Sequence, residues 1–207
     1  MKMVTDVSTM TLDGGVECLD FVNSGYDLQK DVVCERLHSY DDLLILLERL
    51  NIFDANCLAS LNVKAEANQN DAENALQSAR EIRGLLYSLF AGIATKSHKK
   101  SADNLLRQIN DLFLDAFRYK QLVIHDGHLH FSFQWEAAGL MAPVWRFVLS
   151  ALDLLNTGNL QYVRQCQRCA WLFYDQTKNH RKKWCSMESC GNREKTKRYY
   201  KNKKQVL

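Results

Sequence analysis

Four of the seven cysteines fall in two close pairs near the C-terminal end of the chain. Two residues separate Cys166 from Cys169, four separate Cys185 from Cys190, and fifteen lie between the pairs. Thiolates are preferred zinc ligands, and a structural zinc site takes four ligands in tetrahedral geometry. We therefore predict one Zn²⁺ ion bound by these four cysteines. The alternative, thioredoxin-like redox chemistry, calls for a βαβ context that the sequence lacks.

The residues around the two pairs indicate how the pairs come together. Residues 171–175 and 181–185 have the pattern of short strands on either side of the turn-forming stretch 176–180. Ser186 is a favourable N-cap, which would put Cys185 just before a helix and Cys190 in its first turn. A knuckle, a hairpin and a helix predict a small treble-clef-like zinc finger. Zinc binding would supply the deciding free energy, because so small a unit cannot fold by core burial alone.

Three aromatic side chains and one histidine of the finger also need an interpretation. We expect Trp171, Phe173 and Trp184 to form a miniature core belonging to the finger itself, with stacking on nucleic-acid bases as the alternative. His180 could replace a cysteine as a ligand, but four cysteines already complete the set.

Charge divides the chain into two parts. Residues Leu160–Leu207 carry thirteen basic and three acidic side chains, a net charge of +10, whereas the other 159 residues have a net charge of −7. A strongly basic segment suggests an anionic partner, most often nucleic acid. The alternative is a basic tail that docks on the acidic body.

The last predicted helix combines basic and aromatic residues, as nucleic-acid surfaces do. Tyr199 and Tyr200 lie among its basic side chains. A merely solvated terminal helix is the alternative. The predicted nucleic-acid contacts are Arg193, Lys195, Lys197, Arg198, Lys201 and Lys204.

Helices are expected to position this finger. Apolar residues recur every three or four positions in 72–94 and 101–117, and Asp41 and Asp42 precede a leucine-rich run. A further helix is predicted from Pro143 to Leu155, where residues 156–158 stop it. The predicted fold class is mainly α, with a helical N-terminal domain (1–160) containing one β-hairpin, followed by the small finger (161–207).

The predicted hairpin covers residues 121–133 around an Asp-Gly turn. Pairing across this turn sets Ile124 opposite Leu129 and Leu122 opposite Phe131, and we expect that apolar face to pack on the helices. The other face carries three histidines, and we interpret it as facing solvent rather than binding a metal.

Composition restricts the class of protein. No leader-like stretch is present at the N-terminus and nowhere do about 18 apolar residues run together, so we expect a soluble, cytoplasmic protein. Isolated cysteines in apolar contexts, as at Cys18, Cys34 and Cys57, are usually buried hydrophobes. We expect no enzyme, because four thiolates close the zinc shell and no carboxylate and histidine are paired at catalytic spacing.

Two motifs resemble known families. Residues 184–200, with Cys190-Gly191-Asn192-Arg193 at their centre, resemble the CGNR zinc finger. In that family the first cysteine pair is often more widely spaced than Cys166 and Cys169 are here. Residues 18–24 and 39–50 resemble the start of the helical ABATE domain that usually precedes this finger. The resemblance implies a stress-induced transcription regulator that binds DNA. It also marks Gly191, Asn192 and Arg193 as signature positions. Gly191 would allow a close approach of the backbone, and Asn192 and Arg193 could either brace the zinc loop or contact a phosphate.

The two-domain layout suggests that the helical domain senses a small molecule or a partner. Asp20 and Asn23, polar residues in an apolar stretch, are the candidate ligand-binding residues. Helix capping or a buried hydrogen bond is the alternative for both. The alternatives for the whole protein are an RNA-binding or ribosome-associated module and a protein-interaction finger.

Overall fold

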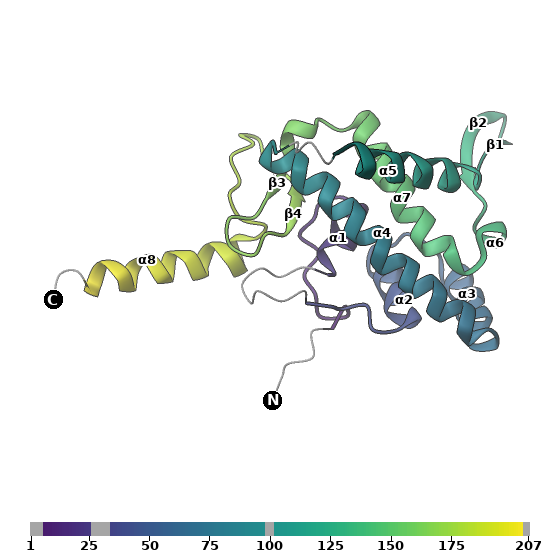
Figure 1. Ribbon diagram of the computed structural model, residues 1–207, viewed down its shortest axis with the longest axis horizontal. Coiled ribbons are helices and arrows are strands. Elements are labelled where there is room, and N and C mark those ends of the chain that lie inside the picture. The colour runs from purple at the N-terminus through teal and green to yellow at the C-terminus, as the bar shows by residue number, and fades with distance from the viewer. Residues whose placement is uncertain (1–5, 26–33, 98–101, 205–207) are drawn as a thin grey trace.

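The computed structural model describes residues 6–25, 34–97 and 102–204, with the side chains of residue 102, residue 198 and residues 201–204 excepted (Figure 1). The described chain is mainly helical, with two short antiparallel sheets of two strands each. The helices are α1 (Glu17–Asn23), α2 (Tyr40–Arg49), α3 (Ala55–Ala67), α4 (Gln69–Thr95), α5 (Ala102–Phe117), α6 (Trp135–Ala138), α7 (Ala142–Thr157) and α8 (Asn192–Lys204). The short turns are η2 (Gly139–Met141), η3 (Leu160–Tyr162) and η4 (Met187–Gly191), and the strands are β1 (Lys120–His125), β2 (His128–Phe133), β3 (Val163–Gln165) and β4 (Leu172–Tyr174).

Helix α4 is the central element of the fold. It contacts α1, α2, α3, α5 and α7 within the helical domain and both strands of the finger. Its buried stripe includes Leu76, Ile82, Leu86 and Phe90, spaced so that they share one face of the helix. Helices α1 and α7, which both contact α4, also pack on each other through the stacked rings of Phe21 and Phe147, whose centroids lie 4.4 Å apart.

The predicted helices are present, with somewhat different ends. Ser39 caps α2 in a capping box with Asp42, so that this helix begins before the leucine-rich run. Ser101, the predicted start of the helix that corresponds to α5, lies outside the described residues. Sequence reasoning missed α3, whose apolar positions are scattered, and the short α6.

The hairpin has the predicted register, but its apolar face was placed wrongly. Leu122 pairs with Phe131 and Ile124 with Leu129, as expected. These four side chains are 55% to 73% exposed instead of packing on the helices. The hairpin stands at the end of α5 and projects from the body, which leaves that face open (Figure 1).

Within the residues that the structure describes, one segment is long and apolar enough to cross a membrane by length and composition alone. This segment is Trp135–Thr157, and 56% of its most apolar stretch is buried inside the fold. Arg146 within it forms an ion pair with Glu17 at 3.0 Å. Packing as a core helix therefore accounts for its apolar character.

The finger and the helical domain share one hydrophobic core. Strand β3 packs against α4 and β4 packs against α1. Trp171, Leu172 and Phe173 are buried in the same cluster as the leucines of α2 and α4. The expectation that the finger has a core of its own is therefore wrong, because its strands lie directly on the helices.

Candidate metal centre

The four predicted ligands lie together. Cys166, Cys169, Cys185 and Cys190 are all buried, and their sulfur atoms lie within 4.8 Å of one another. The Sγ atoms of Cys169 and Cys185 are 3.6 Å apart, and those of Cys185 and Cys190 are 3.7 Å apart. A tetrahedral site with Zn–S bonds of about 2.3 Å places its sulfurs about 3.8 Å apart. The arrangement therefore fits a zinc ion bound by four thiolates.

Electrostatics also calls for a cation here. Hydrogen bonds to Cys166 and Cys169 raise the pKa of the Cys185 thiol well above its ordinary value, and burial raises the pKa of Cys190. Four buried thiolates this close would repel one another strongly. A divalent cation bound by these residues would remove the repulsion and hold all four in the deprotonated form.

The first pair lies on a tight knuckle between β3 and β4. The main-chain N–H of Cys166 donates to Trp171 O at 2.8 Å, and that of Ala170 donates to Cys166 O at 3.1 Å. Ala170 closes the turn with φ of 58°, in the left-handed region that favours glycine. This reversal directs the sulfurs of Cys166 and Cys169 to the same point.

The second pair lies at the start of the C-terminal helix, as predicted. Ser186 has extended backbone, and its hydroxyl accepts from the N–H of Glu188 at 3.2 Å. Cys185 precedes this cap, and Cys190 lies in the π-helical turn η4, which continues into α8. The cap thus fixes the distance between the two sulfurs of this pair.

The predicted hairpin between the pairs does not form in the predicted way. Residues 171–175 contain β4, but its partner is β3, and residues 181–185 form no strand. Buried Asp175 explains the difference, because its carboxylate accepts from the N–H groups of Thr177 and Lys182. These bonds hold residues 176–182 in a loop, and the finger shows a knuckle and a ligand-bearing helix without the intervening treble-clef hairpin.

His180 is not placed as a zinc ligand. Its ring stacks on Tyr162 with centroids 3.6 Å apart, and its Nδ1 lies 2.7 Å from Asp175 O. Within the described part of the chain, the four cysteines are the one group of three or more potential ligands close enough to hold a metal ion.

The signature positions differ in their surroundings. A Cβ atom on Gly191 would lie 2.7 Å from Met187 Sδ, at the end of a flexible side chain, so glycine eases a close approach. Asn192 Nδ2 donates to Glu188 O at 3.5 Å, which is a weak brace within the helix. The side chain of Arg193 is exposed, and among the described residues it forms no hydrogen bond or ion pair.

The candidate nucleic-acid contacts lie on a projecting helix. Lys195 and Lys197 are exposed on α8, and so are Tyr199 and Tyr200. Figure 1 shows α8 extending away from the rest of the molecule. The side chains of Arg198, Lys201 and Lys204 lie outside the described part of the structure.

A second group of basic side chains was missed by the sequence reasoning. They line an open hollow of about 640 Å³ beside Cys166, and no Asp or Glu lies among the lining residues. Arg164 pairs with Asp175 at 3.5 Å and Arg168 with Glu194 at 3.3 Å, both from outside the lining. The sequence signal that could have identified this group is the number of basic residues that precede α8. The basic residues of the hollow are Arg164, Arg168, Arg181, Lys182 and Lys183.

Asn23 joins the helical domain to the finger. Its Nδ2 donates to Leu172 O at 2.8 Å, and its Oδ1 accepts from Leu172 N at 2.8 Å. Asn23 is fully buried, and both polar groups of its side chain form hydrogen bonds with one residue of β4. This agrees with the buried hydrogen bond given as the alternative to ligand binding.

Asp20 also takes part in an internal hydrogen bond. Its Oδ1 accepts from Gly14 N at 2.8 Å, and burial raises the pKa of its carboxyl group to about 7. It borders an open hollow of about 650 Å³ together with Glu17 and Arg146. Ligand binding by Asp20 stays a prediction.

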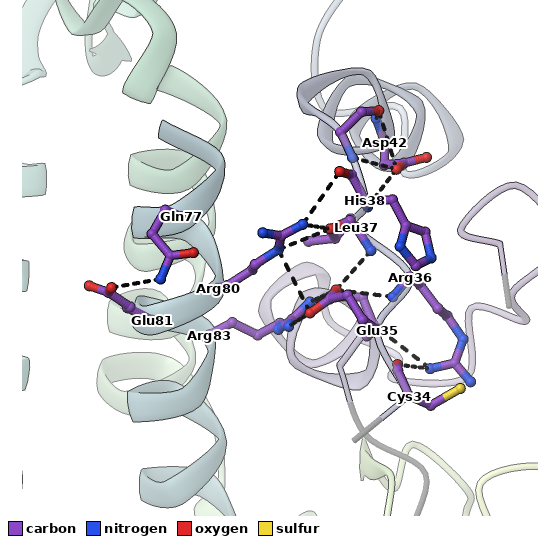
Figure 2. Close-up of polar contacts among 12 residues, drawn as sticks. Cys34, Glu35, Arg36, Leu37, His38, Asp42, Gln77, Arg80, Glu81 and Arg83 are labelled. Carbon is purple, nitrogen blue, oxygen red and sulfur yellow. Dashed lines mark hydrogen bonds and ion pairs between the residues drawn. The ribbon is translucent and has the colours of Figure 1, made fainter. Parts of the chain in front are cut away.

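Buried arginines reinforce the junction between the finger and the helices. Arg36 Nη1 donates to Cys34 O at 3.1 Å, and its guanidinium lies 5.3 Å from the centre of the Trp171 ring. Figure 2 shows Glu35 between this arginine and the side chains of Arg80 and Arg83 from α4. Arg83 Nη1 donates to Glu35 Oε1 at 2.7 Å. Glu35 thus pairs with two of these guanidinium groups, Arg80 and Arg83, whereas Arg36 is satisfied by main-chain oxygens.

The fold and the site define a class: a helical domain whose core continues into a four-cysteine zinc finger. Comparison with protein families specifies it further. Residues 162–203 match the CGNR zinc finger, and residues 15–159 match ABATE, described as "Putative stress-induced transcription regulator". Because the second match covers most of the chain, this protein belongs to the ABATE family, which confirms the resemblance seen in the sequence. A search of curated proteins found no match.

Proposed function

We propose that this protein regulates transcription by binding DNA through its zinc finger and helix α8. The observation that carries the proposal is the concentration of positive charge around the metal centre. Residues Leu160–Leu207 have a net charge of +10, and a zinc ion with four thiolates contributes −2, which leaves +8. Charge of this size attracts the phosphate backbone of nucleic acid.

The shape of α8 supports the same role. Its described side chains are polar or aromatic on all sides, and the helix projects from the body (Figure 1). A helix without an apolar face gains little from packing on its own domain. Exposed lysines and tyrosines instead suit contact with phosphates and sugars. This placement argues against the alternative that the basic tail docks on the acidic body.

The basic hollow provides a second contact region. Arg181 and Lys183 carry positive charge at its rim, whereas Arg164 and Arg168 are partly neutralised by their carboxylate partners. We propose that the hollow and α8 contact neighbouring phosphates. We also propose that the protein is not an enzyme, that it acts in the cytoplasm, and that the helical domain transmits the presence of an effector.

Binding to labelled duplex DNA, followed by fluorescence anisotropy, tests the proposal. The logarithm of affinity should fall with the logarithm of salt concentration with a slope of about −0.9 per phosphate contacted, for roughly four to six contacts. Lys195→Ala/Lys197→Ala and Arg181→Ala/Lys183→Ala should each weaken binding and flatten the slope by about 2. Arg107→Ala/Arg118→Ala, which removes the same charge from the helical domain, should change neither quantity.

Arg193→Ala tests whether the side chain at this signature position contacts DNA or braces the zinc loop. If Arg193 contacts a base edge, discrimination between DNA sites should fall by about 1–3 kcal/mol while zinc stays bound. RNA that competes more strongly than duplex DNA would favour the RNA-binding alternative. Zinc-loaded protein with no affinity for either nucleic acid would contradict the proposal and favour a protein-interaction finger.

A further inference from the structure

Helix α5 and the β1–β2 hairpin, which the proposed DNA binding does not use, carry a group of exposed apolar side chains, here called the outer apolar face. Seven large apolar side chains on α5 and the β1–β2 hairpin are 46% to 73% exposed. Phe117 and Phe131 lie edge to face with centroids 6.1 Å apart, which joins the helix part to the hairpin part. The seven are Leu106, Leu114, Phe117, Leu122, Ile124, Leu129 and Phe131.

The hairpin carries four of these seven side chains on a sheet of only two strands. Its sheet has two strands, and Leu122, Ile124, Leu129 and Phe131 lie on one side of it. An isolated two-stranded hairpin is marginally stable in water unless its apolar face is covered. A partner that covers this face would therefore stabilise the hairpin as well as bury the surface.

The size of the face fits a protein interface. With about 180 Å² for a fully exposed large apolar residue, the seven side chains expose about 700 Å². The largest apolar patch of a monomeric protein is usually about 300–600 Å². Two such faces together would bury about 1,400 Å², within the range of stable protein–protein interfaces at about 1,200–2,000 Å².

The outer apolar face has both a protrusion and a hollow. The tip side chains Ile124 and Leu129 are the most exposed, at 73% and 68%. On the helix part of the face, Phe113, Leu114 and Phe117 of α5, with Asn110 and Leu152, line an apolar hollow of about 370 Å³. A protrusion and a hollow on the same surface are what a twofold axis requires, because each copy then fills the hollow of the other.

The charges around the face are compatible with self-association. Residues 105–131 contain three basic and three acidic side chains, a net charge of zero. A second copy is therefore not repelled, and an anionic membrane finds no basic rim to attract it. The basic helix α8 lies at the opposite end of the molecule, which keeps the two fingers of a dimer apart (Figure 1).

We propose that two copies of this chain form a symmetric dimer through the outer apolar face, with the hairpin tip of each copy in the α5 hollow of the other. This inference does not depend on DNA binding or on zinc. It predicts that the dimer presents two separate finger surfaces to nucleic acid.

Sedimentation equilibrium of the full-length, zinc-loaded protein tests the dimer. Wild-type protein should be dimeric at micromolar concentration, and Ile124→Glu/Leu129→Glu should weaken the dimer by at least about tenfold per substitution. Gln121→Glu/His130→Glu adds two negative charges to the opposite face of the same hairpin and should leave the dimer intact. Circular dichroism should show the same helix content for all three proteins.

Leu114→Lys on α5 provides a second test, because this exposed side chain lies outside the hairpin. It should also produce monomers, even if the hairpin variant folds poorly. Wild-type protein that stays monomeric would overturn the proposal, as would dimers that persist in Leu114→Lys. Binding of the wild-type protein to neutral phosphatidylcholine vesicles without dimerisation would identify a lipid surface as the occupant instead.

Discussion

The side-chain amide of Asn23 forms two hydrogen bonds with the main chain of Leu172, each 2.8 Å long. It acts as a short extra strand on the free edge of β4, contributed by the last residue of α1. Through this pair, the helical domain holds the strand that follows the first two zinc ligands.

Asn23→Ala should destabilise the protein by about 2–6 kcal/mol. The substitution leaves the N–H and C=O groups of Leu172 buried without these partners, at a cost of about 1–3 kcal/mol each. Urea unfolding measures the change, and limited proteolysis should cut the finger of the variant sooner. Asn62→Ala, which removes an exposed hydrogen bond to Glu66 on α3, should change stability by less than about 0.5 kcal/mol. Equal effects of the two substitutions would contradict the role of Asn23.

Cys190→Ser should remove zinc and weaken the helical domain too. The finger loses the free energy of metal binding, of order 10 kcal/mol, and Trp171 and Phe173 then leave the core that they share with the helices. Elemental analysis should find one zinc per chain in the wild type and none in the variant. Hydrogen exchange should become faster in α1 and α4.

Cys57→Ala is the matched control for the zinc prediction. Cys57 is buried in α3 and is not one of the four clustered cysteines, so this variant should keep its zinc. Unchanged exchange in α1 and α4 after zinc loss would show that the two parts fold independently after all.

Asp20→Asn should stabilise the protein at alkaline pH and have little effect at acidic pH. Burial raises the pKa of Asp20 from 3.8 to about 7, although the N–H of Gly14 acts in the opposite direction. The favourable contribution of the neutral carboxyl group is complete below pH 3.8 and is lost as pH rises through about 7. Three pKa units correspond to at most about 4 kcal/mol.

Thermal unfolding from pH 4 to pH 9 checks this pH dependence. The difference in melting temperature between Asp20→Asn and the wild type should grow with pH. Asp126→Asn, at an exposed turn, should give a constant difference. A flat difference for both variants would mean that Asp20 is ionised in the folded protein.

Glu35→Gln should destabilise the protein by about 3–5 kcal/mol at neutral pH, because it leaves the buried guanidinium of Arg83 without its counter-charge. Although burial alone raises the pKa of Glu35, its hydrogen bond and ion pair with Arg83 lower it below the ordinary 4.5. The carboxylate therefore stabilises the fold above about pH 4.5, and this is lost as pH falls through the lower folded pKa.

Chemical unfolding at pH 7 and at acidic pH measures the contribution of Glu35. The cost of Glu35→Gln should shrink towards acidic pH, where the wild-type carboxylate is also protonated. Glu66→Gln at an exposed position should cost little at either pH. A cost that does not depend on pH would indicate that packing, rather than the charge of Glu35, is what matters.

Sequence patterns determined the local features of this protein. The spacing of Cys166, Cys169, Cys185 and Cys190 predicted the metal centre, because ligand chemistry depends on residue type and short separation along the chain. Ser186 predicted the helix start beside them, since an N-cap acts within three residues. The family motifs identified both domains on the same local basis.

Tertiary structure alone decided which surfaces meet. Nothing in residues 121–133 reveals that their apolar face stays open, because alternation marks a face without naming its partner. Hydrogen bonds to Asp175 hold residues 176–182 in a loop and prevent the predicted strand, so contacts across the loop decided this feature. Asn23 meets Leu172 across 149 residues of sequence. The buried partner that Asn23 finds is settled only when the helices pack, since a hydrogen bond between residues so far apart in sequence depends on distances that local propensity does not determine.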